Sequence, residues 1–195
     1  MRGPLPAGRQ AAYCRLVEQR PRSGDARRAS GLPAVGVLSD AARLSRVRAV
    51  AAGAGSSTIL TGLVQLAGRV AASDCAQLSL LADQQVATVV RCAESHYSEQ
   101  VSDLADSLCT VTVLSGDVLV AADTRTHPWL LDLPPITSGA VGSYLGVPLL
   151  LADGTAVGAL CVYGPHPRQW TDRHVGLTCD VGDIVAAELD RLAGR

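Results

Sequence analysis

Two apolar runs, residues 143–151 and 155–163, are separated in the sequence only by a short step that contains Asp153-Gly154. An Asp-Gly pair between two such runs is a strong signal for a tight hairpin turn. Alternate residues of each run would point to opposite faces of a strand. The pattern therefore predicts an antiparallel β-hairpin, and with it an antiparallel sheet.

Other segments are expected to extend this sheet. Residues 76–82 and 86–92 flank a turn at Asp83 and favour a second antiparallel hairpin. Residues 118–122 are expected to form a strand that ends at Asp123.

Residues 107–115 fit two structures. Their Thr-Val-Thr-Val core favours a strand, whereas Ser107 as a cap and Gly116 as a stop favour a short helix. The sequence leaves both open. The polar, acidic segment 93–107 before it is expected to be a loop or an irregular helix.

Two helices are expected to flank the strands. Ser57 can cap a helix over residues 57–72, and Thr171 can cap a second one over residues 172–192. The second helix has two rows of mostly apolar residues, so it could face both the sheet and a partner helix. The heptad-like row consists of Val175, Thr178, Gly182, Val185, Leu189 and Leu192. The additional row consists of Leu177, Val181 and Ile184. The order of elements predicts an α+β fold, an antiparallel β-sheet with helices packed on one face.

The first 55 residues differ in composition from the rest. Residues 1–50 hold ten Arg and three acidic residues, whereas residues 51–195 hold seven Arg and fifteen acidic residues. A basic segment could contact nucleic acid, but no aromatic or helical pattern accompanies these arginines. We expect a disordered arginine-rich leader over 1–55, a folded domain over 56–193, and no nucleic-acid partner.

Apolar runs and cysteines indicate the compartment. The longest apolar runs, such as 145–151, fall far below the ~18 residues of a membrane span, and no secretory signal is present. The six cysteines are scattered and form no Cys-x-x-Cys pair; they are Cys14, Cys75, Cys92, Cys109, Cys161 and Cys179. We therefore expect a cytoplasmic protein with buried thiols in place of disulfides, no structural metal site and no membrane partner.

Several motifs occur in an order typical of one family. Residues 107–128 combine a Leu-Cys step, a Ser-Gly turn, a strand and a terminal Asp. Ser-Tyr-Leu-Gly-Val-Pro begins at 143, Val-Gly-Ala-Leu-Cys-Val covers 157–162, and Arg-Gln-Trp-Thr covers 168–171. Together these motifs resemble the GAF domain family over about residues 57–192. The resemblance implies paired N- and C-terminal helices on one sheet face and a pocket on the other.

The resemblance also implies a set of pocket residues. Carried over by position, the ligand-binding residues would be Cys109, Thr112, Asp123, Trp129, Tyr144 and Cys161. Each has a simpler interpretation: the cysteines and aromatic residues can be packing residues, and Asp123 at a strand end can bind loop backbone.

Within that family, the chain resembles actinobacterial-type GAF sensors that accompany serine phosphatases, histidine kinases or cyclases. This resemblance implies a regulatory domain that senses a small molecule or a partner and signals through a separate output protein, such as a serine phosphatase or a kinase. It also implies a homodimer through helices 57–72 and 171–192. A ligand-free dimeric docking module is an alternative that the sequence leaves open.

Three ligand classes of the family are disfavoured. Its cyclic-nucleotide signature needs Asn, Lys and Phe, and this chain has none of the three. Bilin attachment uses a Cys-His step, which is missing. Haem needs a proximal His, whereas the histidines fall in expected loops or helix starts; they are His96, His127, His166 and His174. The cofactor, if any, is not identified by sequence.

An enzymatic alternative rests on Cys109. Free methionine-R-sulfoxide reductases resemble this chain, and the resemblance places their catalytic Cys at Cys109, at a helix start where the thiol pKa is lowered. Their resolving Cys lies farther upstream than Cys92, and their acidic loop is replaced by residues 129–135. Redox sensing by Cys109 and Cys161 is a further hypothesis. The main expectation remains a non-enzymatic regulatory domain.

Overall fold

A six-stranded sheet forms the centre of the domain in the computed structural model, which describes residues 38–92 and 100–194. The strand order is β3-β2-β1-β6-β5-β4, and every neighbouring pair is antiparallel. The strands are β1 (Cys75–Leu81), β2 (Gln85–Cys92), β3 (Gln100–Ser102), β4 (Leu119–Ala121), β5 (Ser143–Leu150) and β6 (Ala156–Gly164). Both predicted hairpins and the predicted fold class are confirmed.

The helices between and around these strands are α2 (Ala41–Ala54), α3 (Thr58–Val70), α4 (Leu108–Ser115), α5 (Pro134–Thr137) and α6 (Asp172–Ala193). Two short 3-10 helices, η2 (Leu104–Asp106) and η3 (Thr124–Thr126), lie in the loops before α4 and after β4. The two helices predicted from their caps are confirmed as α3 and α6. The Ser57 side chain accepts a hydrogen bond from the Leu60 amide, and Thr171 accepts one from the His174 amide.

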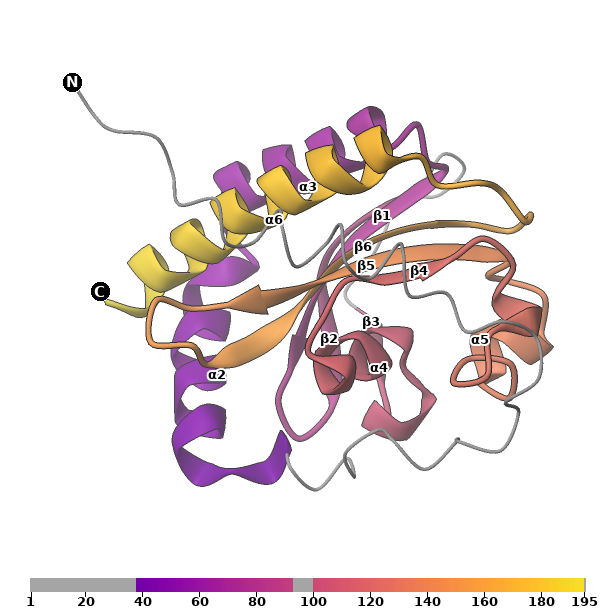
Figure 1. Cartoon of the computed structure of the whole chain (residues 1–195). Coiled ribbons are helices and arrows are strands. Elements are labelled where there is room, and N and C mark those ends of the chain that lie inside the picture. Colours follow the sequence, from indigo (N-terminus) through magenta and orange to yellow (C-terminus); the bar gives the residue numbers. More distant parts are fainter. Residues whose placement is uncertain (1–37, 93–99, 195) are drawn as a thin grey trace. The chain divides into compact units, whose positions relative to one another are not determined.

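Helices α3 and α6 lie side by side on one face of the sheet (Figure 1). Gly182 of α6 brings the helix backbone close to β5: a Cβ atom at this position would lie 3.0 Å from the Val147 side chain. Of the second apolar row predicted on α6, Val181 is buried, Leu177 is half-buried and Ile184 is exposed.

Helix α2 corrects the expected domain boundary. Residues 41–54 were expected to belong to a disordered leader, but they form a helix with Asp40 as its cap. Buried residues recur every three or four positions along it and pack toward α6; they are Leu44, Val47, Val50 and Ala54. Arginine and alanine between these positions hide the apolar stripe in the sequence. Residues 1–37 of the expected leader lie outside the described residues.

Helix α4 covers part of the opposite face of the sheet, against β5 and β6. Its caps decide the ambiguity in the sequence: the Ser107 hydroxyl accepts from the Thr110 amide, and Gly116 ends the helix at φ 69°. The left-handed conformation at this position favours glycine. Residues 93–99 of the acidic segment before α4 lie outside the described residues.

The cysteines do not all remain thiols. Cys75 and Cys92 stand opposite each other on β1 and β2 and form a disulfide, so the expectation of thiols alone was wrong. Cys109, Cys161 and Cys179 are free. Cys14 lies outside the described residues.

Among the described residues, no single helix has the length and apolar composition needed to cross a membrane. Helices α2 and α3 meet those criteria only as a pair bent by 94°.

Candidate functional site

Two free thiols meet on the sheet face below α4. The Sγ atoms of Cys109, in the first turn of α4, and Cys161, on β6, are 3.7 Å apart. Both side chains are buried. The predicted pocket cysteines therefore form a direct contact.

Tyr144 and Thr112 complete this group, which we call the thiol cluster: Cys109, Thr112, Tyr144 and Cys161. The Tyr144 hydroxyl lies 2.8 Å from Thr112 Oγ1 and donates to Cys109 Sγ at 3.8 Å. Thr112 Oγ1 also lies 3.1 Å from the Leu108 carbonyl within α4, and its single proton is shared between that carbonyl and the Tyr144 hydroxyl. All polar atoms of the cluster thus have partners inside the protein.

The backbone periodicities explain why these residues meet. Cys109 and Thr112 are three positions apart in α4 and share its sheet-facing side. Tyr144 and Gly146 are two positions apart in β5 and share a face, and Gly146 stands opposite Cys161 in the sheet. The Tyr144 side chain passes over Gly146, where a Cβ atom would lie 2.5 Å from both the Thr112 and the Tyr144 oxygens.

The contacts set the order in which these groups ionise. The hydrogen bond from Cys161 lowers the pKa of the Cys109 thiol and outweighs burial, which raises it. The pKa of Cys161 is raised well above its usual value, by that same bond and by burial. Burial also raises the pKa of Tyr144. Cys109 is therefore the group of the cluster that ionises first, beside a tyrosine that remains a hydrogen-bond donor.

Polar side chains that the sequence did not single out extend from the cluster toward the disulfide. A hydrogen bond from Ser79 also lowers the pKa of Cys109. Ser79 accepts from Gln77 at 2.6 Å, and Tyr163 donates to Gln77 at 3.3 Å. The Tyr163 hydroxyl in turn lies 3.9 Å from Cys92 Sγ. Alternation along β1 and β6 would have placed these residues on the cluster face once the sheet order was known.

Trp129 and Asp123, the other two predicted pocket residues, lie outside the thiol cluster. Trp129 packs against the same hydrophobic core as the cluster, and its ring meets His127 edge-on at 5.7 Å. Asp123 does not join the cluster: it accepts from the Arg125 amide at 3.1 Å and from Nε and Nη2 of the Arg125 guanidinium at 2.9 Å each. The pKa of its carboxyl is lowered by Arg125. Asp123 therefore holds the η3 loop.

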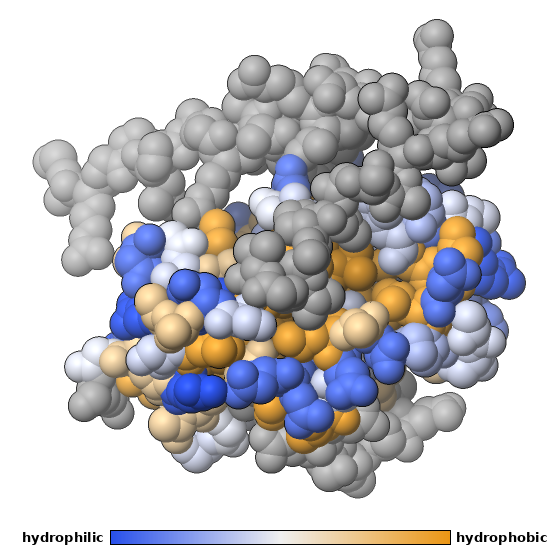
Figure 2. All heavy atoms as spheres, turned by 90° about the horizontal axis from the view of Figure 1, so that it is seen from below, coloured by the Kyte–Doolittle hydropathy of each residue, from blue (hydrophilic) through white to orange (hydrophobic). Residues whose placement is uncertain are grey.

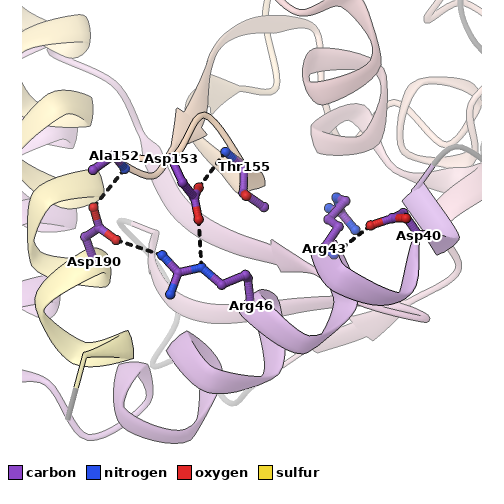
Figure 3. A network of polar contacts seen from close by, with 7 residues as sticks. All are labelled: Asp40, Arg43, Arg46, Ala152, Asp153, Thr155 and Asp190. Carbon is purple, nitrogen blue, oxygen red and sulfur yellow. Dashed lines mark hydrogen bonds and ion pairs between the residues drawn. The ribbon is translucent and has the colours of Figure 1, made fainter.

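A second polar region lies at the N-terminal half of α2 (Figure 3). Arg46 Nε lies 3.0 Å from Asp153 in the β5–β6 turn, and its Nη2 lies 3.2 Å from Asp190 of α6. Arg43 donates from Nε to the Ala156 carbonyl at 2.9 Å. Arg43, Arg46 and Asp153 border an open groove of about 540 Å³.

Both carboxylates that pair with Arg46 are also held by backbone amides: Asp190 accepts from the Ala152 amide at 2.8 Å, and Asp153 accepts from the Thr155 amide at 2.9 Å. The groove network therefore ties α2, the turn and α6 together. Figure 2, which views the molecule from below, shows apolar and hydrophilic side chains interspersed on that face. Across the described residues, no group of three His, Cys, Asp or Glu side chains could hold a metal ion.

Comparisons with known proteins agree with this architecture. The model of one family, the GAF domain, matches residues 56–189. A comparison with curated protein sequences found no match.

Solved structures share the fold. One is the GAF domain from the Acinetobacter phosphoenolpyruvate-protein phosphotransferase, at TM-score 0.57 and 13% identity over 78% of this chain and 95% of that one. Type II free methionine-R-sulfoxide reductase from Thermoplasma acidophilum gives TM-score 0.56 and 17% identity over 73% of this chain and 96% of that one. The blue-light absorbing form of the Thermosynechococcus elongatus PixJ GAF domain gives TM-score 0.56 and 19% identity over 76% of this chain and 89% of that one. At these identities the likeness extends to the fold alone.

Proposed function

Because this chain belongs to the GAF domain family, we propose that it is a regulatory domain that senses a small molecule at the thiol cluster and signals through a separate output protein. The observation that carries the proposal is the convergence of Cys109, Thr112, Tyr144 and Cys161 from α4, β5 and β6 on one buried point. Apolar side chains would fill the same core without the cost of burying hydroxyl and thiol groups. Polar groups placed inside an apolar pocket are typical of ligand sites.

The cluster suggests the chemistry of the ligand. Tyr144 and Thr112 offer a hydroxyl pair, the two thiols are soft and polarisable, and the surrounding walls are apolar. A small, mostly apolar molecule with one hydrogen-bonding group fits this set. Tyr144, only 1% exposed, fills the site itself and would have to move aside to admit it.

A single strand connects the cluster to the opposite face. Tyr144 and Gly146 of β5 face the cluster, and Val147 of the same strand packs against Gly182 of α6. A displaced Tyr144 would shift β5 and hence the contact with α6, because packed cores respond by discrete rearrangement.

The paired helices α3 and α6 are the proposed output surface. Ile59 of α3 and Ile184 of α6 are 53% and 52% exposed, which is high for isoleucine on a folded domain. We propose that a second copy of the chain packs on these helices, and that the dimer presents the signal to the output protein.

Native mass spectrometry of the protein purified from its own host tests the sensing site. The proposal expects a mass excess that disappears on denaturation, in the wild type and in the Gly62→Ala control, whose added methyl group meets nothing within 4 Å. Tyr144→Ala should lose that excess. A wild type without any adduct, or an equal adduct in Tyr144→Ala, would refute small-molecule sensing at the cluster.

A thiol enzyme is the second candidate, favoured by one observation: Cys161 stands 3.7 Å from Cys109, where a resolving thiol would be needed. The Cys109 thiolate would attack the sulfur of a sulfoxide; with uptake of one proton, the sulfoxide oxygen would pass to Cys109, which becomes a sulfenic acid, and the thioether would leave. Cys161 would then displace water to give a disulfide, which an external dithiol reduces. Turnover of free methionine-R-sulfoxide with dithiothreitol, abolished by Cys109→Ser, would support this candidate, and no turnover would exclude it.

A further inference from the structure

We propose that Cys109 and Cys161 form a reversible disulfide when the protein meets a peroxide, so that the thiol cluster is a redox input as well as a binding site. This inference deepens the proposed function and rests on it for the regulatory consequence. The disulfide itself is a property of this chain that can be measured without knowing the ligand or the output protein.

The geometry that carries the inference is the 3.7 Å between the two sulfur atoms. A disulfide bond is about 2.05 Å long, so the atoms must approach by less than 2 Å. The two thiols come from different elements, α4 and β6, and they are 52 residues apart in the chain. A bond between them would fasten the helix to the sheet.

The surroundings distinguish the two thiols. Cys109 lies in the first turn of α4, where unpaired backbone amides favour a negative charge. The Tyr144 hydroxyl donates to its sulfur at 3.8 Å. Cys161 lacks a helix terminus of its own and lies mid-strand on β6. Cys109 is therefore the attacking thiol and Cys161 the resolving one.

The third free thiol in the described part of the chain serves as a contrast. Cys179 lies on α6, on the other face of the sheet, and burial with three nearby carboxylates raises its pKa to about 11. It is thus poorly ionised at neutral pH. Oxidation should select the cluster and leave Cys179 as a thiol.

The chemistry is a two-electron oxidation by hydrogen peroxide. The Cys109 thiolate attacks one peroxide oxygen and the O–O bond breaks; the sulfur is oxidised to a sulfenic acid, and the other oxygen takes a proton and leaves as water. The Cys161 sulfur then attacks the sulfenic sulfur, and its own proton joins the departing hydroxide as a second water. Two thiols and one peroxide give one disulfide and two waters, and an external dithiol reverses the change.

The disulfide would alter the sensing site. Cys109 would no longer accept the hydrogen bond from Tyr144, and α4 would be held against β6. Tyr144 would keep Thr112 as its partner. The oxidised cluster is then more rigid than the reduced one.

The experiment is peptide mapping of the full chain after treatment with hydrogen peroxide, followed by alkylation of the remaining thiols in denaturant. Trypsin leaves Cys92 and Cys109 on one fragment, between Arg91 and Arg125, so a second protease that cuts at acidic residues is needed to separate them. We expect a peptide that links Cys109 to Cys161, lost again after dithiothreitol.

Three variants sharpen the result. Cys161→Ser should trap a sulfenic acid on Cys109, which dimedone labels, and Cys109→Ser should leave Cys161 as a thiol. Cys179→Ser is the matched control and should retain the linked peptide. Circular dichroism verifies that each variant is folded.

A wild type that yields no Cys109–Cys161 peptide, or that links either residue to Cys92 or Cys179, would overturn the inference. That failure is distinct from failure of the proposed function. If a small molecule is bound but the linked peptide does not form, the domain senses by ligand binding alone. If the linked peptide forms but no molecule is bound, the domain senses oxidation alone.

Discussion

Tyr144 is the residue that joins the parts of the thiol cluster. Its hydroxyl contacts Thr112 at 2.8 Å and Cys109 at 3.8 Å, so one oxygen atom of β5 holds two residues of α4. A hydrogen bond of this kind contributes about 1 kcal/mol to stability, and a hydroxyl left without its partner costs more.

A double-mutant cycle measures that contact. Tyr144→Phe and Thr112→Val should each lower the free energy of unfolding by about 1–2 kcal/mol, and the double variant should lose about 1 kcal/mol less than the sum. Urea denaturation followed by circular dichroism provides the values. Simple additivity would show that the hydroxyls do not interact.

His127 gives the site loop a pH dependence. Burial lowers the pKa of His127, and its Nδ1 accepts from the Trp129 amide at 3.4 Å, which requires the neutral ring. A base whose pKa is lowered by folding contributes stability above its unfolded pKa of about 6.5 and loses it as the pH falls through the folded value.

The free energy of unfolding should therefore fall from pH 7.5 to pH 5 by a larger amount in the wild type than in His127→Gln. Urea denaturation at the two pH values measures the difference, with His166→Gln, an exposed histidine, as the control. Equal losses in the wild type and His127→Gln would show that His127 does not cause this pH dependence.

The family resemblance, carried over by position, named the four cluster residues, and the structure brings their side chains together. Periodicity alone did not name them, because residues 107–115 fitted both a strand and a helix. The role of Asp123 was undecided, since a carboxylate at a strand end can serve a ligand or a loop, and the structure gives it to Arg125.

The spacing of Cys75 and Cys92 in the sequence does not predict their disulfide. Near the turn, the hairpin pairs Leu81 with Gln85, and that register continued unchanged would set Cys75 opposite Arg91. A one-residue irregularity at Leu78/Ser79 shifts the pairing and brings Cys92 opposite Cys75. Such a bulge has no signature in the sequence.

At the scale of elements, β5 decides the architecture of the site. Its cluster face needs a position without a side chain at Gly146, so that Tyr144 can pass over it toward α4. Its other face packs Val147 against α6. The strand therefore separates the cluster from the paired helices by one layer of backbone.

Gly146→Ala tests this arrangement. Its new methyl group would lie 2.5 Å from the Thr112 and Tyr144 oxygens, so we expect a loss of about 1–3 kcal/mol in the free energy of unfolding. Gly62→Ala is the matched control: it lies in helix α3 with open space around it and should gain about 0.5–1 kcal/mol. Thermal or urea denaturation of both variants provides the comparison, and a neutral Gly146→Ala would contradict the packing described.

Two elements show where pattern reasoning reaches its limit. In α4, strand-like residues form a helix because Ser107 and Gly116 cap it and because all of its residues Leu108–Val113 are buried. In α2, frequent arginines make the row of buried apolar residues hard to recognise in the sequence. The helix is stabilised by the packing of that row against α6. Local propensity predicts neither outcome alone.

At the scale of the whole molecule, the proposed dimer is the route by which the cluster reaches an output protein. Ile184→Glu would place a charge in the proposed interface and should shift the chain to monomer in sedimentation velocity. Leu131→Glu, at a similarly exposed apolar side chain in the loop before α5, is the control and should leave the dimer intact. A wild type that is monomeric at all concentrations would contradict the dimer.

A change in the thiol cluster is proposed to alter the packing of α6 through β5, and this coupling is central to the proposed function. Hydrogen–deuterium exchange with mass spectrometry tests it most directly, by comparing the wild type with Tyr144→Phe, which removes one oxygen atom from the cluster. We predict faster exchange in β5 and in the part of α6 around Gly182, with β3 and η2 unchanged. Exchange that changes only in α4 and β5, with α6 as in the wild type, would contradict the claim and leave the cluster a local feature of the core.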